Sequence, residues 1–338
     1  MTSIRTGDMA QAYVLRRQTG DLKSALDRLT QEMGSGQRAD LGAATSGDFR
    51  TLAGIDHSLA NLDAFHNATT ESGLLTETLQ SALRTTQSLA ADIAPSLLQA
   101  GSGGSGTQIR LVANDARQRL FATVGALNVR VADRYALSGD ATDKRPLSDA
   151  QDILGGLMTA ISGQVTISGV SSAVDGWFNA PPGGGGFLDM VYGGSATPLA
   201  PFQIGQGDQA SVVLTAADPV LRDTLKGLAL AALVAEGALP GDQNAQSGLL
   251  QLAGQRLTTA NGNLAELRGT LGTVEAQISD VATRNVAEKT ALQLARNGIV
   301  AADPYDTANE LQATKTQLET MFTLTARLSR LSLADFLR

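Results

Sequence analysis

The chain has 338 residues, of which 43% are hydrophobic, only 4% are aromatic and 17% are charged, so it is long enough for a core and for more than one domain. Its formal net charge is -7 and its basic residues form no cluster, which argues against nucleic acid and anionic membranes as partners. The absence of cysteine excludes disulfides, thiolate metal sites and a cysteine nucleophile.

The N-terminal segment predicts an amphipathic helix with a coiled-coil seam. Its apolar residues follow one another at spacings of seven, four, three and four, which places them on one narrow stripe. These residues are Leu15, Leu22, Leu26, Leu29 and Met33. Glycines between residues 34 and 48 end this helix. No continuous apolar run precedes it, so we expect no cleaved secretory signal peptide.

Helical periodicity then continues from residue 52 to residue 127, with an interruption at the run GSGGSG, residues 101–106. Between about residues 150 and 220 the pattern changes. The runs VTISGV and ASVVLTA are rich in β-branched residues and predict short strands, whereas PPGGGG predicts a loop. We therefore expect a small β-rich insert in this part of the chain.

Helix returns at about residue 218. The apolar run that starts at Leu225 is shorter than a membrane span and contains charges, so it predicts a core helix. The longest heptad pattern follows and predicts a packed helical rod. Its seam consists of Leu264, Leu267, Leu271, Val274, Ile278 and Val281. A last helix is expected after the N-cap Asp303, with Pro304 at its first position.

The last helix carries more apolar surface than one partner helix covers. Its apolar residues occupy roughly two thirds of the circumference, whereas a single antiparallel partner would cover about a third. These residues are Leu318, Met321, Phe322, Leu324, Leu328, Leu331, Leu333, Phe336 and Leu337. We predict that they form an assembly interface with the N-terminal seam, and that other copies cover the remainder. An ordinary bundle within one chain fits the periodicity equally well.

The expected fold is mainly α: a long antiparallel helical coiled coil or bundle formed by the N- and C-terminal halves, with a small β-rich inserted outer domain. We expect three parts. These are the terminal helices of an inner assembly domain (1–45 and 302–338), a helical rod domain (46–140 and 220–301) and the outer domain (141–219).

No motif supports catalysis or cofactor binding. GSGGSG matches a dinucleotide fingerprint only formally, because it follows a helical pattern. His57 and His66 lie nine residues apart, which does not bring two rings to one metal. Asp140 and Asp143 lack the spacing of a calcium loop. We expect no enzyme activity, no cofactor, no metal and no small-molecule substrate.

Two minor alternatives remain in the expected outer domain. The run GGGG at residues 183–186 could cradle a phosphate, although a loop is the simpler interpretation. Trp177 and Phe178 could bind carbohydrate, although such a pair more often anchors a small core.

The closing segment ADPYDTANELQATKTQLETMFTLTARLSRLSLADFL resembles the C-terminal signature of the flagellin superfamily. Its ending is most similar to the hook-filament junction proteins of the hook-associated protein 3 family. Three other stretches resemble the same family: LTQEMGSGQRAD, NVRVADRYALSGDATDKRPL and VYGGSATPLAPFQIGQGDQASVVLTAADPVLRDTL. The chain departs from the family pattern at Leu137, where Phe is usual, and at Gln37, where a basic residue is usual.

This resemblance implies an extracellular structural protein of the bacterial flagellum, exported through the flagellar type III apparatus without a cleaved signal. It implies ring assembly with other copies, between hook-associated protein 1 and flagellin, and an export chaperone that covers the C-terminal helix. Three alternatives remain: a flagellin, a helical stalk with an adhesive or enzymatic outer lobe, and an intracellular coiled coil.

Overall fold

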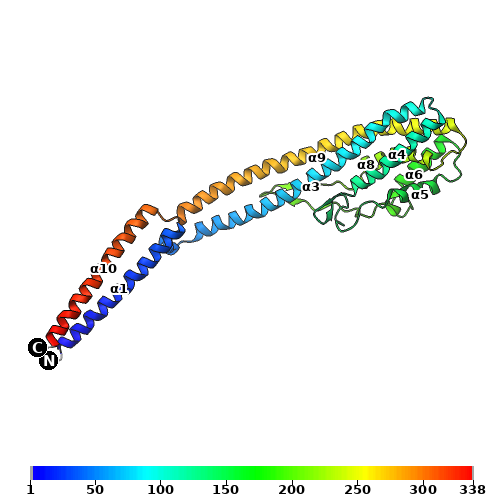
Figure 1. Cartoon of the computed structure of the whole chain (residues 1–338). Helices are drawn as coiled ribbons and strands as arrows, with labels where there is room; N and C mark the ends of the chain where they lie inside the picture. The colour runs from blue at the N-terminus through cyan, green and yellow to red at the C-terminus, as the bar shows by residue number, and fades with distance from the viewer. Residues whose placement is uncertain (1–2, 337–338) are drawn as a thin grey trace. The chain divides into compact units, whose positions relative to one another are not determined.

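The computed structural model describes residues 3–336, and the side chains of residues 9, 10 and 12–327 among them. The chain forms two compact units. The terminal unit comprises Met1–Leu62 and Ala287–Arg338, and the central unit comprises Asp63–Val286. Helices dominate both units (Figure 1), which confirms the expected mainly α fold. The three-part division expected from the sequence stays a prediction.

The terminal unit is built on two helices from opposite ends of the chain. α1 (Ser3–Ser35) and α10 (Pro304–Phe336) lie side by side and antiparallel (Figure 1), as the sequence predicts. The one-turn helix α2 (Leu41–Ala44) follows α1. Parts of α3 (Arg50–Gly101) and α9 (Gln243–Val300) complete the unit.

Backbone hydrogen bonds join the end of α1 to the end of α9 within the terminal unit. The N–H of Arg38 donates to the carbonyl of Val300 at 2.8 Å, and the N–H of Ala302 donates to the carbonyl of Gly36 at 3.0 Å. Gly36 has φ of +68°, a left-handed conformation that favours glycine and ends the helix. The C-terminal ends of α1 and α9 therefore lie next to each other.

Side-chain caps start the helices that follow turns. Asp303 accepts hydrogen bonds at Oδ1 from the N–H groups of Tyr305 and Asp306, at 2.8 and 3.2 Å, which confirms the predicted start of α10. Ser105 accepts from the N–H of Gln108 at 3.3 Å and caps α4 (Gly106–Leu127). The run GSGGSG therefore forms a short turn between α3 and α4.

The core of the central unit surrounds α8 (Pro219–Ala235). Every residue of this helix from Thr224 to Val234 is buried, because α4, α5 (Ala150–Ala160) and α6 (Ile167–Asn179) all pack against it. The predicted core helix is thus confirmed. None of the helices that the structure describes combines the length and hydropathy needed to cross a membrane.

The predicted seam of α9 is largely buried. Leu264 and Leu271 belong to the main core, while Ile278 and Val281 form a second apolar cluster with Ile204 and Ala210. Leu267 and Val274 are partly buried beside them. The heptad pattern therefore identified the packed face of this helix correctly.

Strands are few and short in the described part of the chain. β1 (Arg130–Val131) pairs with β2 (Arg134–Tyr135), and β3 (Phe202–Gln203) pairs with β4 (Gln209–Ala210), both antiparallel. The β content of the insert is thus smaller than expected.

The predicted strand VTISGV is wrong. Thr166 accepts a hydrogen bond at Oγ1 from the N–H of Gly169 at 3.0 Å and caps α6, so the following β-branched residues begin a helix. The run ASVVLTA alternates buried and exposed residues as an extended segment does, with Val212 and Leu214 buried. Among the described residues, however, only Ala210 of this run belongs to a strand pair.

Candidate assembly interface

The predicted N-terminal seam is covered to different degrees by α10. Leu29 is buried, whereas Leu15, Leu22 and Leu26 are half-buried and Met33 is 40% exposed. The α1 and α10 pair therefore leaves part of its own seam open to solvent.

The predicted residues of α10 follow the same gradient. Leu318 and Met321 are half-buried, whereas Phe322 is 48% and Leu324 is 45% exposed. The ammonium of Lys23 lies 5.8 Å from the centre of the Phe322 ring. The remaining predicted side chains lie outside the described residues. They are Leu328, Leu331, Leu333, Phe336 and Leu337.

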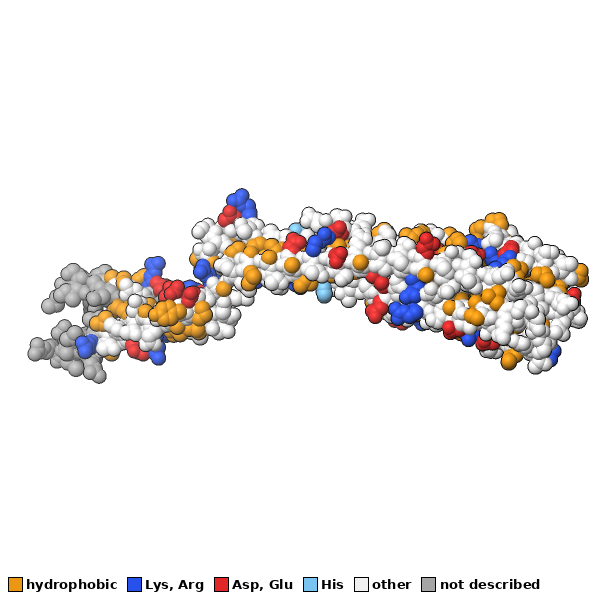
Figure 2. All heavy atoms as spheres, turned by 90° about the horizontal axis from the view of Figure 1, so that it is seen from above, with side chains coloured by type: hydrophobic (Ala, Val, Ile, Leu, Met, Phe, Trp, Pro, Cys, Tyr) orange, Lys and Arg blue, Asp and Glu red, His pale blue; other side chains and the backbone are white. Residues whose placement is uncertain are grey.

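The structure adds exposed apolar residues that the sequence analysis missed. Met9 is 74%, Tyr13 is 68% and Val14 is 51% exposed on α1, away from the narrow stripe. Their spacing could have shown a second apolar stripe, because Met9 and Tyr13 are one helical turn apart. Figure 2 shows hydrophobic side chains exposed on the terminal unit. Exposed apolar residues mark an interaction surface where they form one large contiguous patch.

A shallow groove of about 480 Å³ runs between α1 and α10. Leu22 and Met321 line it with apolar side chains, and its other lining residues are polar. These are Gln18, Asp21, Thr316, Gln317 and Thr320. A mixture of apolar and polar side chains is also found in protein interfaces.

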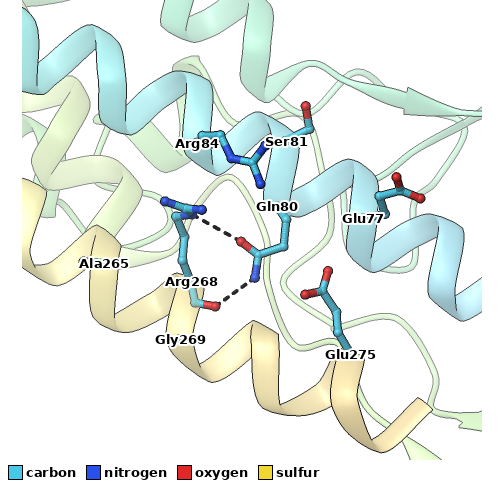
Figure 3. A pocket seen from close by; sticks show the side chains of 8 residues that line it. All are labelled: Glu77, Gln80, Ser81, Arg84, Ala265, Arg268, Gly269 and Glu275. Atoms are coloured by element: carbon cyan, nitrogen blue, oxygen red, sulfur yellow. Dashed lines mark hydrogen bonds between the residues drawn. The ribbon is translucent and has the colours of Figure 1, made fainter. Parts of the chain in front are cut away.

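A second, polar groove of about 620 Å³ lies between α3 and α9 in the central unit (Figure 3). The side-chain amide of Gln80 donates to the carbonyl of Arg268 at 2.8 Å and accepts from the Nε of Arg268 at 3.2 Å. Arg268 also donates to Gln87 at 2.6 Å. These bonds form the floor of the groove and fix the antiparallel register of the two helices.

The residues considered for ligand binding have packing roles. The backbone N–H groups of Gly183 and Gly185 donate to the carboxylate of Asp189 at 2.8 and 2.7 Å, and these bonds hold the pKa of Asp189 below its usual value. The glycine loop thus uses these amides within the chain. Trp177 and Phe178 pack edge to face at 5.1 Å, and Phe178 is fully buried.

His57 and His66 are exposed on α3. Across the described side chains, no group of three or more His, Asp and Glu residues has the geometry to hold a metal ion.

The C-terminal part of the chain is similar to a known protein family. Residues 255–337 match the family model described as the bacterial flagellin C-terminal helical region. The crystal structure of Bacillus cereus FlgL is 18% identical, with a TM-score of 0.47, over 71% of this chain and 99% of that chain. A comparison with curated proteins finds no match. The resemblance of the C-terminal segment to the flagellin superfamily is confirmed by the family match.

Proposed function

Because the chain carries the C-terminal helical region of the bacterial flagellins, we propose that it is a structural protein of the flagellum that joins the hook to the filament. Its closing residues resemble those of the junction proteins more closely than those of flagellins. In this role the chain acts by packing against other subunits, and it catalyses no reaction.

The exposed apolar surface of the terminal unit is the single observation that supports this proposal most strongly. Met9, Tyr13, Phe322 and Leu324 remain 45% exposed or more after α1 and α10 have paired. At about 25 cal/mol per Å², covering such side chains contributes substantially to association. The proposed interface consists of the N-terminal seam, the exposed residues Met9 and Tyr13 beside it and the apolar residues of α10, with neighbouring copies in a ring covering them.

The proposed partners follow from the same role. Hook-associated protein 1 would contact one end of the ring and flagellin the other. The chain would leave the cell through the flagellar export apparatus without cleavage, and an export chaperone would cover the apolar C-terminal helix before assembly. Residues 1–45 and 302–338 would form the inner layer, residues 46–140 and 220–301 the surrounding layer, and residues 141–219 the outer lobe.

Localisation on detached flagella tests the proposal. The chain has no cysteine, so Val165→Cys at an 80% exposed site introduces one labelling position in the outer lobe. We expect a dye at this position to mark only the hook end of each filament. Label along the whole filament would contradict the junction role and support a flagellin.

Flagellin is the second candidate, because the matched family model is that of flagellin itself. Flagellin subunits extend a filament without limit, whereas a junction protein stops after a ring. Purified chain mixed with short filament fragments distinguishes the two. We expect no increase in filament length, and elongation would favour the flagellin alternative.

A further inference from the structure

The apolar seam between α1 and α10 repeats every seven residues on both helices. Leu15, Leu22 and Leu29 of α1 follow one another at this spacing, and so do Leu311 and Leu318 of α10. Leu29 is buried, and the other four are half-buried. If one helix moved along the other by seven residues, which is about 10 Å, leucine would again face leucine. Apolar packing alone therefore does not fix the alignment of the two helices.

Polar contacts along the seam do not fix this alignment either. Among the described side chains, no hydrogen bond or ion pair joins α1 to α10. The hydroxyls of Thr19 and Thr316 donate to carbonyls of their own helices, at 2.8 and 2.9 Å. The contact of the Lys23 ammonium with the Phe322 ring is made by a flexible side chain over a half-exposed ring. The alignment must therefore be set at the ends of the helices.

Specific hydrogen bonds gather where α1 ends and α10 begins. The two backbone bonds described above join residues 36–38 to residues 300–302. The Nε of Arg38 adds a third bond, to the carbonyl of Ala301 at 3.1 Å. α1 ends directly before this bridge, and α10 begins two residues after it. The bridge thus holds the end of one helix beside the start of the other.

A buried carboxylate supports the bridge from the last turn of α1. Glu32 is only 6% exposed, and its Oε1 accepts hydrogen bonds from the N–H of Ala39 at 3.0 Å and from Nη1 of Arg28 at 3.3 Å. Without these donors, a carboxylate at this position would be costly. The bond to Ala39 folds the turn back over the helix end, so that Arg38 lies beside residues 300–302.

We propose that Glu32, Arg38 and the bridge between residues 36–38 and 300–302 form a register lock, which fixes the alignment of α1 with α10. A polar contact at one end then specifies the register of a seam whose apolar residues would accept more than one, as a single polar residue does in coiled coils. Glu32 and Arg38 act as positioning residues, because they set where the seam residues meet.

The consequence of the lock rests on the proposed function. Met9 and Tyr13 of α1 and Phe322 and Leu324 of α10 belong to the proposed assembly interface. A shift of seven residues would move the two α1 residues by about 10 Å relative to the two α10 residues. A neighbouring copy would then meet a different surface, so the lock ensures that every copy presents the same one.

Cysteine scanning on detached flagella reads the alignment. The chain has no cysteine, and Gln317 lines the groove between α1 and α10 together with Gln18 and Leu22. One cysteine replaces Gln317, and a second is moved one residue at a time along residues 9–29. Tagged variants are expressed together with the untagged wild type, whose copies complete the assembly. A cross-link within one chain migrates as a monomer, and we expect its yield to have a single maximum within residues 18–22.

Two variants separate the lock from general stability. Glu32→Leu with Arg38→Ala removes both side-chain bonds but keeps the helix end apolar and packed. We expect a second maximum seven residues from the first, with a yield there at least about tenfold higher than without the two substitutions. Glu32→Gln with Arg38→Lys keeps an acceptor for Ala39 and a donor for Ala301. This matched control should retain the single maximum.

The register lock would be overturned by an unlocked variant that keeps the single maximum, or by two maxima or none when the lock is intact. Exclusion of both double variants from flagella would also overturn it, because the control retains the bonds, whereas exclusion of the unlocked variant alone would support it. A tag found along the whole filament would refute the junction role. The scan would still report the alignment there, so the two failures are distinguishable.

Discussion

The guanidinium of Arg256 on α9 donates hydrogen bonds to both carboxylate oxygens of Asp175 on α6, at 2.7 and 2.6 Å. Lys226 of α8 is buried and lies 3.4 Å from Asp175 and 2.9 Å from Asp223. One carboxylate thus joins three helices of the central unit. Lys226 and Arg256 are partly or largely withdrawn from water, and Asp175 compensates the charge of Arg256 and, together with Asp223, that of Lys226.

Asp175→Ala is expected to lower the free energy of unfolding by about 2 kcal/mol. Breaking a fully buried pair costs more, but Asp175 is about one third exposed. Urea denaturation measures the change. Glu71→Ala is the matched control, because its ion pair with Arg134 is exposed on both sides and should contribute less than about 1 kcal/mol. Equal losses in the two variants would show that the partial burial of Asp175 and its partners adds nothing to the stability that their ion pairs contribute.

The same carboxylate gives stability a dependence on pH. Burial alone would raise the pKa of Asp175, but the hydrogen bonds and charges of Arg256 and Lys226 outweigh it and leave the pKa below its usual value. The folded state therefore gains stability that is fully present above the unfolded-state pKa of about 3.9 and is lost as the pH falls through the folded-state value.

We expect the difference in unfolding free energy between the wild type and Asp175→Asn to be constant at neutral pH and to shrink below about pH 4. Urea denaturation at a series of pH values measures it. A difference that grows in acid would show that the pKa of Asp175 is raised.

Ile278→Asp is expected to lower the free energy of unfolding by several kcal/mol, because it places a carboxylate in a packed apolar cluster. Ile278 is 4% exposed and lies with Val281 against Ile204 and Ala210. Ser279→Asp, on the exposed side of the same helix turn, should change stability by less than about 0.5 kcal/mol. Thermal and urea unfolding measure the free energy of unfolding of the two variants. Similar losses of stability in both would contradict the prediction.

Two glycines in helices should respond to alanine in opposite directions. Gly73 has no atom within 4 Å of an added Cβ, so Gly73→Ala should stabilise the chain by about 0.5–1 kcal/mol through helix propensity. At Gly227 an added Cβ would lie 2.6 Å from Cδ2 of Leu257, so Gly227→Ala should destabilise it by about 1–3 kcal/mol. Denaturation midpoints measure both, and stabilisation by Gly227→Ala would contradict the observed packing of α8 on α9.

The sequence predicted correctly the helices whose apolar residues recur with a regular period. The prediction failed at VTISGV, where a single helix cap determines the secondary structure. Heptad spacing identified the buried face of α9, because a helix can bury such a stripe only by packing it. VTISGV was misassigned because β propensity is weak compared with the cap at Thr166 and the burial of Val170.

The two grooves required the three-dimensional register. Glu77 and Glu275 are far apart in the sequence, and only the antiparallel contact of α3 with α9 brings them to one end of a groove. Exposure along the terminal helices likewise depends on which stripe of α1 faces α10. Periodicity proposed one stripe, and the structure shows that Tyr13 lies off it and remains open.

Tyr13→Asp is expected to leave the thermal unfolding of the free protein unchanged and to prevent its incorporation at the hook end. Tyr13 is 68% exposed, so its apolar ring gains cover only from another molecule, and a carboxylate there would be desolvated on assembly. Leu29→Asp is the matched comparison on the same helix, because Leu29 is 2% exposed and its replacement should destabilise the pair of α1 and α10 within one chain. Calorimetry of the purified variants and counts of labelled hook ends in cells that lack the wild-type chain separate the two effects. If Tyr13→Asp assembled normally, this face of α1 would not contribute to the junction. If Tyr13→Asp lowered the melting temperature as much as Leu29→Asp, the aromatic ring of Tyr13 would already be buried within the monomer.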